Sequence, residues 1–259
     1  MGADTVVSGF QQAIRNRRVR AVLFRVDSPG GSAVASDAIA RAVARTREAG
    51  KPVIVSMGSV AGSGGYWVSM DADRIIAAPG TLTGSIGVVY AKFFTRRLSE
   101  RLGITRDEVH RGANALLFSQ NEKLTDGQWE RVGAWLDGVY DEFVDRVAKG
   151  RRLSRGEVEP VARGRVWTGA DARERKLIDR TGGYLESLAE VRELLGVAPD
   201  TPLRLRPMPK KRLLEQLGMA LPHAEDSGAL AGVIRQLLRS LGIADRGVVR
   251  MPDWIDRLR

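Results

Sequence analysis

The 259-residue sequence contains no cysteine. This absence excludes disulfide frameworks, thiolate catalysis and zinc sites with cysteine ligands, although it fixes no cellular compartment. The sequence also lacks any apolar run near the roughly 18 residues that a membrane span requires, and no signal-peptide pattern opens it. We therefore expect any membrane anchor to lie outside this sequence.

Aromatic residues make up 6% of the chain and histidine occurs twice, at His110 and His223. Apolar residues still account for 43%, which is enough to bury a substantial core in one domain with an appended tail. The net charge of +10 is unevenly spread, because Lys and Arg outnumber Asp and Glu by five in residues 201–259 alone. No nucleic-acid-binding module accompanies this charge, so we expect no nucleic-acid partner.

The most informative residue is Ser63, which lies in a glycine-lined turn. The apolar run 52–57 predicts a buried strand, and Gly62, Gly64 and Gly65 surround the serine directly after it. Glycines relieve crowding around an exposed hydroxyl and allow a substrate backbone to approach. The turn is therefore a candidate nucleophile site, although such a tetrad by itself is common in ordinary loops.

Two further predicted strands end in glycine and serine turns. The run 21–26 leads into Gly30 and Gly31 before a helical stretch, so that two glycine amides lie where an anion can be bound. Residues 74–78 lead to a turn that contains Ser85. Because ligands of parallel α/β sheets gather at the carboxyl ends of strands, we expect these turns to lie together.

Four ordered motifs resemble those of the S49 signal peptide peptidases (protease IV, also called SppA), over residues 4–195. The resemblance implies an α/β, crotonase/ClpP-like fold, here lacking its first strand. It also implies that Ser63 is the nucleophile, that amides around Gly30 and Gly31 stabilise the oxyanion, and that Ser85 helps to position the catalytic pair. The motifs are DSPGGS at 27–32, AGSGGYW at 61–67, TLTGSIGV at 81–88 and GRVWTG at 164–169.

The family base is a neutral lysine, and this chain departs from the pattern at that position. Ala115 occupies the place where the single-domain members carry the lysine. The long members of the family have two repeats, of which the N-terminal one keeps the lysine and the C-terminal one keeps the serine. The chain resembles such a C-terminal repeat that begins mid-domain, so we expect the lysine to come from another repeat or subunit.

The coarse pattern of elements is alternating strands and helices up to Ala78, which indicates an α/β fold. We then expect a helix over 93–102, a strand over 106–111, a long helix over 125–151 and a helix over 185–195. The peptidase-like domain is expected at 1–198 and a basic, partly helical tail at 199–259. Two short amphipathic helices in this tail are either solvated or packed against a subunit, or they contact an anionic membrane surface.

These observations predict a serine endopeptidase that cleaves short apolar peptides, such as cleaved signal peptides, through an acyl-enzyme. It needs no cofactor and no metal, and it works as a homo-oligomer or with a lysine-bearing S49 repeat. The resemblance also suggests that it is membrane-associated. Alternatives are a non-catalytic scaffold that binds peptides, a Ser63–His110 pair with Asp107 nearby, and acyl-CoA chemistry, which fits less well.

Overall fold

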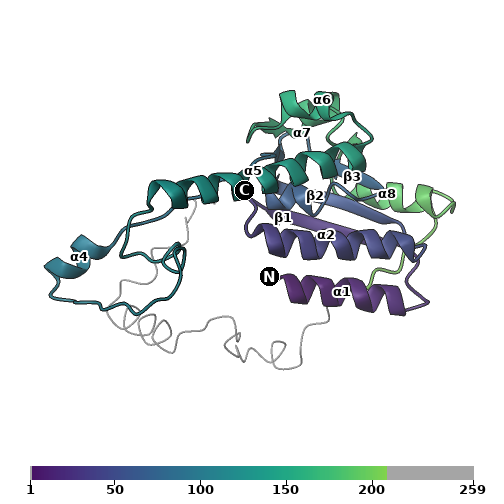
Figure 1. Cartoon of the computed structure of the whole chain (residues 1–259). Helices are drawn as coiled ribbons and strands as arrows, with labels where there is room; N and C mark the ends of the chain where they lie inside the picture. The colour runs from purple at the N-terminus through teal and green to yellow at the C-terminus, as the bar shows by residue number, and fades with distance from the viewer. Residues whose placement is uncertain (1, 209–259) are drawn as a thin grey trace, which may run out of the picture. The chain divides into compact units, whose positions relative to one another are not determined.

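The computed structural model describes residues 2–208, and the strands and helices of this part form an α/β fold (Figure 1). Two predicted features, the basic tail helices and His223, lie outside the described residues. The elements are α1 (Ala3–Arg15), β1 (Val22–Ser28), α2 (Ala33–Glu48), β2 (Val53–Gly62), α3 (Gly64–Trp67), β3 (Arg74–Ala77), β4 (Leu82–Gly84), α4 (Arg96–Arg101), α5 (Asp126–Arg151), α6 (Arg155–Val158), η1 (Glu159–Val161), β5 (Val166–Thr168), α7 (Gly169–Glu174), β6 (Arg180–Thr181) and α8 (Tyr184–Leu194).

The strands form one six-stranded sheet in which β2 is central. The strand order is β5-β4-β2-β3-β6, and β1 also pairs with β2. All pairs are parallel except β4 with β5, which is antiparallel. In the described part of the chain the first element is the helix α1. The third predicted strand of the sequence is two strands, β3 and β4, separated by a short turn.

Helices cover both faces of the sheet, which explains why β2 is apolar along most of its length. Val53 and Val55 face one core, to which α1, α2 and α5 contribute Phe10, Val43 and Phe143. Ile54 faces the opposite side, where Ile76 and Val191 of α8 complete a smaller core. A strand buried on both faces reads as a continuous hydrophobic run rather than as an alternation, and β2 has this form.

The long helix predicted over 125–151 is confirmed as α5. Thr125 is its N-cap and forms a capping box with Gln128, so the start of the helix has the hydrogen bonds that a free N-terminus lacks. The C-terminal part of α5 packs Phe143, Val144 and Val147 into the core. The predicted helix at 185–195 is likewise confirmed as α8.

A segment between β4 and α5 leaves the layered body. We call residues 89–124 the arm. Figure 1 shows α4, which belongs to the arm, apart from the sheet, and the arm continues into the N-terminal half of α5. The helix predicted over 93–102 is reduced to α4, and the strand predicted over 106–111 is wrong, because this stretch has no regular structure. A strand needs a neighbour that accepts and donates its backbone hydrogen bonds, and no other strand lies beside this exposed, highly charged stretch in the described chain.

The end of the described chain stays close to the body. Arg192 of α8 donates a hydrogen bond from Nε to the carbonyl of Thr201 at 3.0 Å, and Leu203 packs against the core under α8. The domain boundary predicted between residues 198 and 199 stays a prediction. No helix of residues 2–208 has the length and apolar character needed to cross a membrane.

Candidate active site at the carboxyl ends of the strands

The three turns expected to gather at one edge of the sheet lie together. Ser28, at the end of β1, is paired with Ala61 of β2, and Gly62 is paired with Gly84 of β4. This register places the turns after β1, β2 and β4 side by side. The prediction that these strand ends form one edge is confirmed, whereas the catalytic roles of their residues stay predictions.

Ser63 occupies a sharp corner between β2 and α3. Its φ of 51° and ψ of −118° are unusual for a residue with a side chain. Two hydrogen bonds hold this conformation, from Ser63 N to the carbonyl of Gly84 at 2.9 Å and from Trp67 N to the carbonyl of Ser63 at 2.8 Å. Strained serines at strand-to-helix corners are typical of nucleophiles, because the turn exposes the hydroxyl. Ser63 is partly exposed, and its Oγ has no hydrogen-bond partner within residues 2–208.

The turn after β1 lies directly against Ser63 because it contains Gly30. A Cβ atom at Gly30 would lie 2.8 Å from Cβ and 3.2 Å from Oγ of Ser63, which leaves no room for a side chain. The φ of Gly30 is also 121°, a value that favours glycine. The glycine at this position therefore serves the close approach of the two turns.

The amides near Ser63 differ in part from the pair expected from the sequence. The N–H of Gly30 donates to Oγ of Ser28 at 3.2 Å, so it is already engaged. The N atom of Gly31 lies 3.2 Å from the position that a Cβ of Gly64 would take. Within residues 2–208 neither Gly31 N–H nor Gly64 N–H has an acceptor. Gly31 and Gly64 are therefore the pair of neighbouring donors left beside the serine.

Gly64 is a residue that the sequence reasoning did not assign to the site. Two features of the sequence indicate it: it follows the nucleophile, and it is the first residue of a helix, whose N–H has no partner within the helix. Ser36 of α2 was also missed. It is 7% exposed, and its Oγ lies 2.5 Å from the position of a Cβ on Gly64. A serine within a predicted helix carries no pattern that would reveal this contact.

Ser85 borders the same corner from the side of β4. Its Cβ lies 3.4 Å from the position that a Cβ of Gly62 would take, next to the turn of Ser63. Its φ is 49°, and its N–H donates to the carbonyl of Arg165 at 2.7 Å. The turn after β4 is thus tied to the segment before β5, and Ser85 is held beside Ser63 by backbone contacts.

The helix that follows Ser63 is anchored by a buried tyrosine. The hydroxyl of Tyr66 donates to the carbonyl of Leu177 at 2.8 Å, and burial raises the pKa of this phenol. Arg151 and Asp179 lie nearby and are joined by two hydrogen bonds of 2.7 and 3.1 Å. Burial alone would lower the pKa of Arg151, but its hydrogen bonding with Asp179 opposes this effect and the pKa is raised. These contacts fix α3, and with it the serine, to the body.

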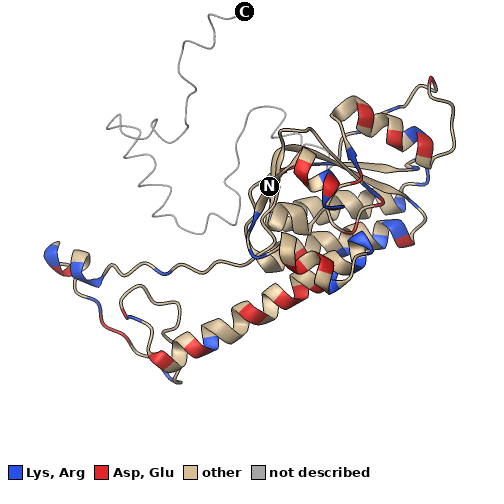
Figure 2. Ribbon diagram, turned by 90° about the horizontal axis from the view of Figure 1, so that it is seen from above, with Lys and Arg blue, Asp and Glu red and all other residues tan. Residues whose placement is uncertain are grey.

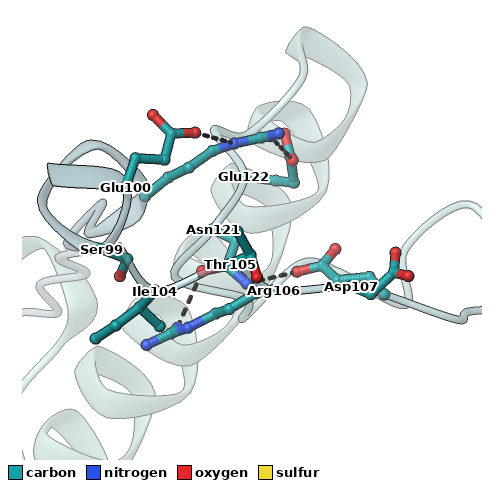
Figure 3. A pocket seen from close by; sticks show the side chains of 10 residues that line it. Ser99, Glu100, Ile104, Thr105, Arg106, Asp107, Asn121 and Glu122 are labelled. Carbon is teal, nitrogen blue, oxygen red and sulfur yellow. Dashed lines mark hydrogen bonds and ion pairs between the residues drawn. The ribbon is translucent and has the colours of Figure 1, made fainter. Parts of the chain in front are cut away.

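The segment expected to carry the base lies in the arm. Ala115 is exposed in a turn of the arm, and His110 is exposed as well. In residues 2–208 no hydrogen bond joins His110 to Ser63. Figure 3 shows Asp107 at a polar cavity of about 370 Å³ that is lined by α4 and residues 104–108, 121 and 122, none of which belongs to the strand-end turns.

The lysines of the described chain are engaged or exposed elsewhere. Lys51 precedes β2, at the opposite end of that strand from Ser63, and its Nζ donates to the carbonyls of Ala13, Ile14 and Asn16. Lys92 donates to the carbonyl of Leu117 at 2.9 Å, and Lys176 pairs with Glu157 at 3.5 Å. Lys123 and Lys149 are exposed. Among residues 2–208, then, no lysine contacts the serine, and no group of three or more metal-ligating side chains is found.

Comparison with known proteins gives relatives whose sequences are similar over most of this chain. The chain is 39% identical to Protease 4 of Haemophilus influenzae over 203 residues, which cover 77% of this chain and 32% of that protein. It is 39% identical to the chloroplastic serine protease SPPA of Arabidopsis thaliana over 188 residues, which cover 72% and 28%. The chain thus spans about a third of the length of these relatives.

A solved structure similar to this chain is a mutant of ClpP1 from Listeria monocytogenes, with a TM-score of 0.47 and 11% sequence identity over 72% of this chain and 86% of that one. The family model for "Peptidase family S49" matches residues 45–198, more than half of the sequence and including the turns of Ser63 and Ser85. The described residues form one mixed sheet between helices, in agreement with the α/β class expected from the sequence. The chain belongs to peptidase family S49.

Proposed function

We propose that this chain is the serine-bearing part of a signal-peptide-peptidase type of endopeptidase. The observation that carries the proposal is the strained, partly exposed Ser63, with Gly30 so close that a Cβ would lie 3.2 Å from the serine Oγ. Its family relatives named as proteases add support. The substrates are short apolar peptides, such as cleaved signal peptides, in keeping with the family resemblance.

The reaction proceeds in two steps. Ser63 Oγ attacks the peptide carbonyl while its proton passes to a neutral lysine Nζ, and the new oxyanion accepts hydrogen bonds from the N–H groups of Gly31 and Gly64. The C–N bond then breaks, and the lysine returns the proton to the leaving amine. In the second step water attacks the acyl carbonyl while the lysine takes a proton from it. The lysine then returns this proton to Ser63 Oγ as the ester C–O bond breaks, which releases the acid product and restores the serine hydroxyl. Ser85 holds the turn that borders this corner.

The lysine is supplied by another S49 repeat or subunit. This part of the proposal is supported by Ala115 and by the engagement of the described lysines away from Ser63. The arm offers a surface for such an assembly, because it exposes large apolar side chains, among them Val89 at 92%, Phe93 at 76% and Phe118 at 72%. Figure 2 shows the connection from β4 to α4 as largely uncharged. Apolar surface of this kind marks sites of protein association.

The test is phosphonylation of Ser63 by a fluorophosphonate, which loses fluoride as the Oγ–P bond forms, when the chain is mixed with a lysine-bearing S49 repeat. We expect labelling of the mixture and none of the Ser63→Ala variant. The chain alone should react roughly 10²- to 10⁴-fold more slowly, because positioned proton transfer usually contributes that much. Labelling of the mixture no stronger than that of Ser63→Ala would refute the proposal.

A scaffold without catalysis is the second candidate, favoured by the lack of a lysine at Ser63 in residues 2–208. It predicts that Ser63→Ala complements a strain that lacks the gene. Loss of complementation by this variant, in a protein of unchanged stability, would exclude the scaffold. Membrane association through the basic tail is part of the proposal as well, and the two helices predicted in that tail lie beyond the described residues.

A further inference from the structure

One arginine of α5 contacts both helices that flank the nucleophile turn. Nη2 of Arg146 lies 2.5 Å from Oδ1 of Asp37 on α2, and its guanidinium carbon lies 5.7 Å from the ring centre of Trp67 on α3. The side chain of Arg146 is 22% exposed and that of Asp37 is 24% exposed, so the ion pair is partly shielded from water. Arg146 thus joins three helices at one place.

The two helices meet directly beside this arginine. Ser36, the neighbour of Asp37, is buried against Gly64, the first residue of α3. The N atom of Gly31 lies 3.2 Å from the position that a Cβ atom on Gly64 would take. The separation of α2 and α3 therefore sets the spacing between the Gly31 and Gly64 amides. A movement of either helix changes both amides relative to Ser63 Oγ.

Packing and charge, rather than a hydrogen bond, hold the Trp67 indole. Its Nε1 is buried and has no partner in the described chain. Phe143 of α5 packs on it with ring centres 4.5 Å apart, and Arg146 lies one helical turn further along the same face. A planar guanidinium can stack on an indole and bind a carboxylate at the same time, which a lysine ammonium does less well.

We propose that Arg146 is a positioning residue for the nucleophile turn. It ties Trp67, one helical turn after Ser63, to Asp37 in the second turn of α2, and so holds the Gly31 and Gly64 amides at the spacing that an oxyanion requires. This inference rests on the proposed peptidase function. Catalytic groups must be held to within about 0.5 Å, and a displacement of about 1 Å costs up to roughly 10²-fold in rate.

The other neighbours of Arg146 decide which variants are informative. Glu142 of the same helix lies 3.2 Å away, and Asp71, whose pKa is raised by burial, feels the charge of Arg146 as well. Asp37 is the carboxylate through which Arg146 contacts α2. Asp37→Asn leaves Arg146 paired with Glu142 but removes its ion pair with α2, together with the pair between Asp37 and Arg41 within α2. Asp37→Asn should therefore reproduce the effect of Arg146→Met.

The experiment compares the rate constant of fluorophosphonate labelling of Ser63 in the assembled protein. We expect Arg146→Met and Asp37→Asn each to label about 10- to 100-fold more slowly, and the double variant to be no slower than either single one, because both remove the same link. Arg146→Lys should lie between wild type and Arg146→Met. The matched control is Arg155→Met, which removes ion pairs to Asp141 and Asp145 on α5 but no contact with α2 or α3.

A second measurement does not depend on activity. In the isolated chain, well below its melting temperature, the amide proton signals of Gly31 and Gly64 should move in Arg146→Met and stay unchanged in Arg155→Met. Normal labelling and unchanged glycine signals in a folded Arg146→Met variant would overturn the inference. If wild type itself fails to label, the proposed function fails, while the glycine signals still decide whether Arg146 positions the two helices.

Discussion

The backbone around Ser63 presents its hydroxyl, and one glycine makes this arrangement possible. Ser63 and Ser85 both have positive φ values, of 51° and 49°, at the ends of neighbouring strands. Gly30 fills the space next to Ser63 with backbone alone. Ser63, Ser85 and Gly30 therefore contribute through their backbone conformations and close approach, as well as through their functional groups.

We expect Gly30→Ala to abolish labelling of Ser63, with a loss of at least roughly 10²-fold. The new Cβ would collide with Cβ of Ser63 at 2.8 Å and would require a strained φ of 121°. Labelling rate and melting temperature are measured together. Gly133→Ala in α5 is the control, because its Cβ meets nothing within 4 Å and alanine is about 1 kcal/mol better than glycine in a helix. Normal labelling by Gly30→Ala would contradict the close approach of the two turns.

At the scale of elements, the four-residue helix α3 depends on its surroundings. A helix this short is not stable by itself, because too few hydrogen bonds form to offset the cost of nucleation. Tyr66 supplies an anchor through its hydrogen bond to Leu177, and Trp67 packs against α5. The position of Ser63 is thus decided by elements that follow it by about 80 to 110 residues.

Tyr66 also predicts how stability depends on pH. Burial raises the pKa of its phenol in the folded chain above the unfolded value of about 10, so its contribution is fully present below pH 10 and is lost as the pH rises further. We expect the melting temperature to fall above pH 10, and to fall less steeply in Tyr66→Phe. At pH 8 this variant should be less stable by about 1 kcal/mol, through the lost hydrogen bond.

The control for this titration is Tyr184→Phe, because Tyr184 is 45% exposed at the start of α8. Thermal unfolding followed by circular dichroism from pH 8 to 11 gives the slopes. Equal slopes for wild type and Tyr66→Phe above pH 10 would show that the buried phenol does not govern alkaline stability.

Across the chain as a whole, the layered body and the arm differ in where they place their apolar side chains. The layered body buries its apolar residues between the sheet and its helices. The arm instead exposes several of them, including Phe93 and Phe118, and Trp135 on the adjoining half of α5 is 52% exposed. This distribution supports an assembly in which the arm contacts a second S49 unit.

We expect the double variant Phe93→Ser/Phe118→Ser to weaken association with the lysine-bearing repeat at least about tenfold, which corresponds to about 1.4 kcal/mol. Its melting temperature should stay close to wild type, because these side chains are exposed in the arm rather than in the core of the body. Sedimentation velocity measures the association. Leu185→Ser is the control, since Leu185 is 74% exposed on α8 outside the arm. Unchanged association in the double variant would exclude these two side chains as the contact.

Periodicity and turn chemistry act locally, and from them we predicted the α/β class, the helices α5 and α8, and the meeting of three glycine and serine turns. The same patterns failed over residues 106–111, where a charged stretch has no strand to pair with. The three-dimensional packing was needed to find that Gly30 N–H is engaged by Ser28 while Gly31 and Gly64 remain beside Ser63. It was also needed to find that Ser36, Asp37 and Arg146 lie around the turn of Ser63. These contacts join residues up to about 110 positions apart, and no local pattern encodes such distances.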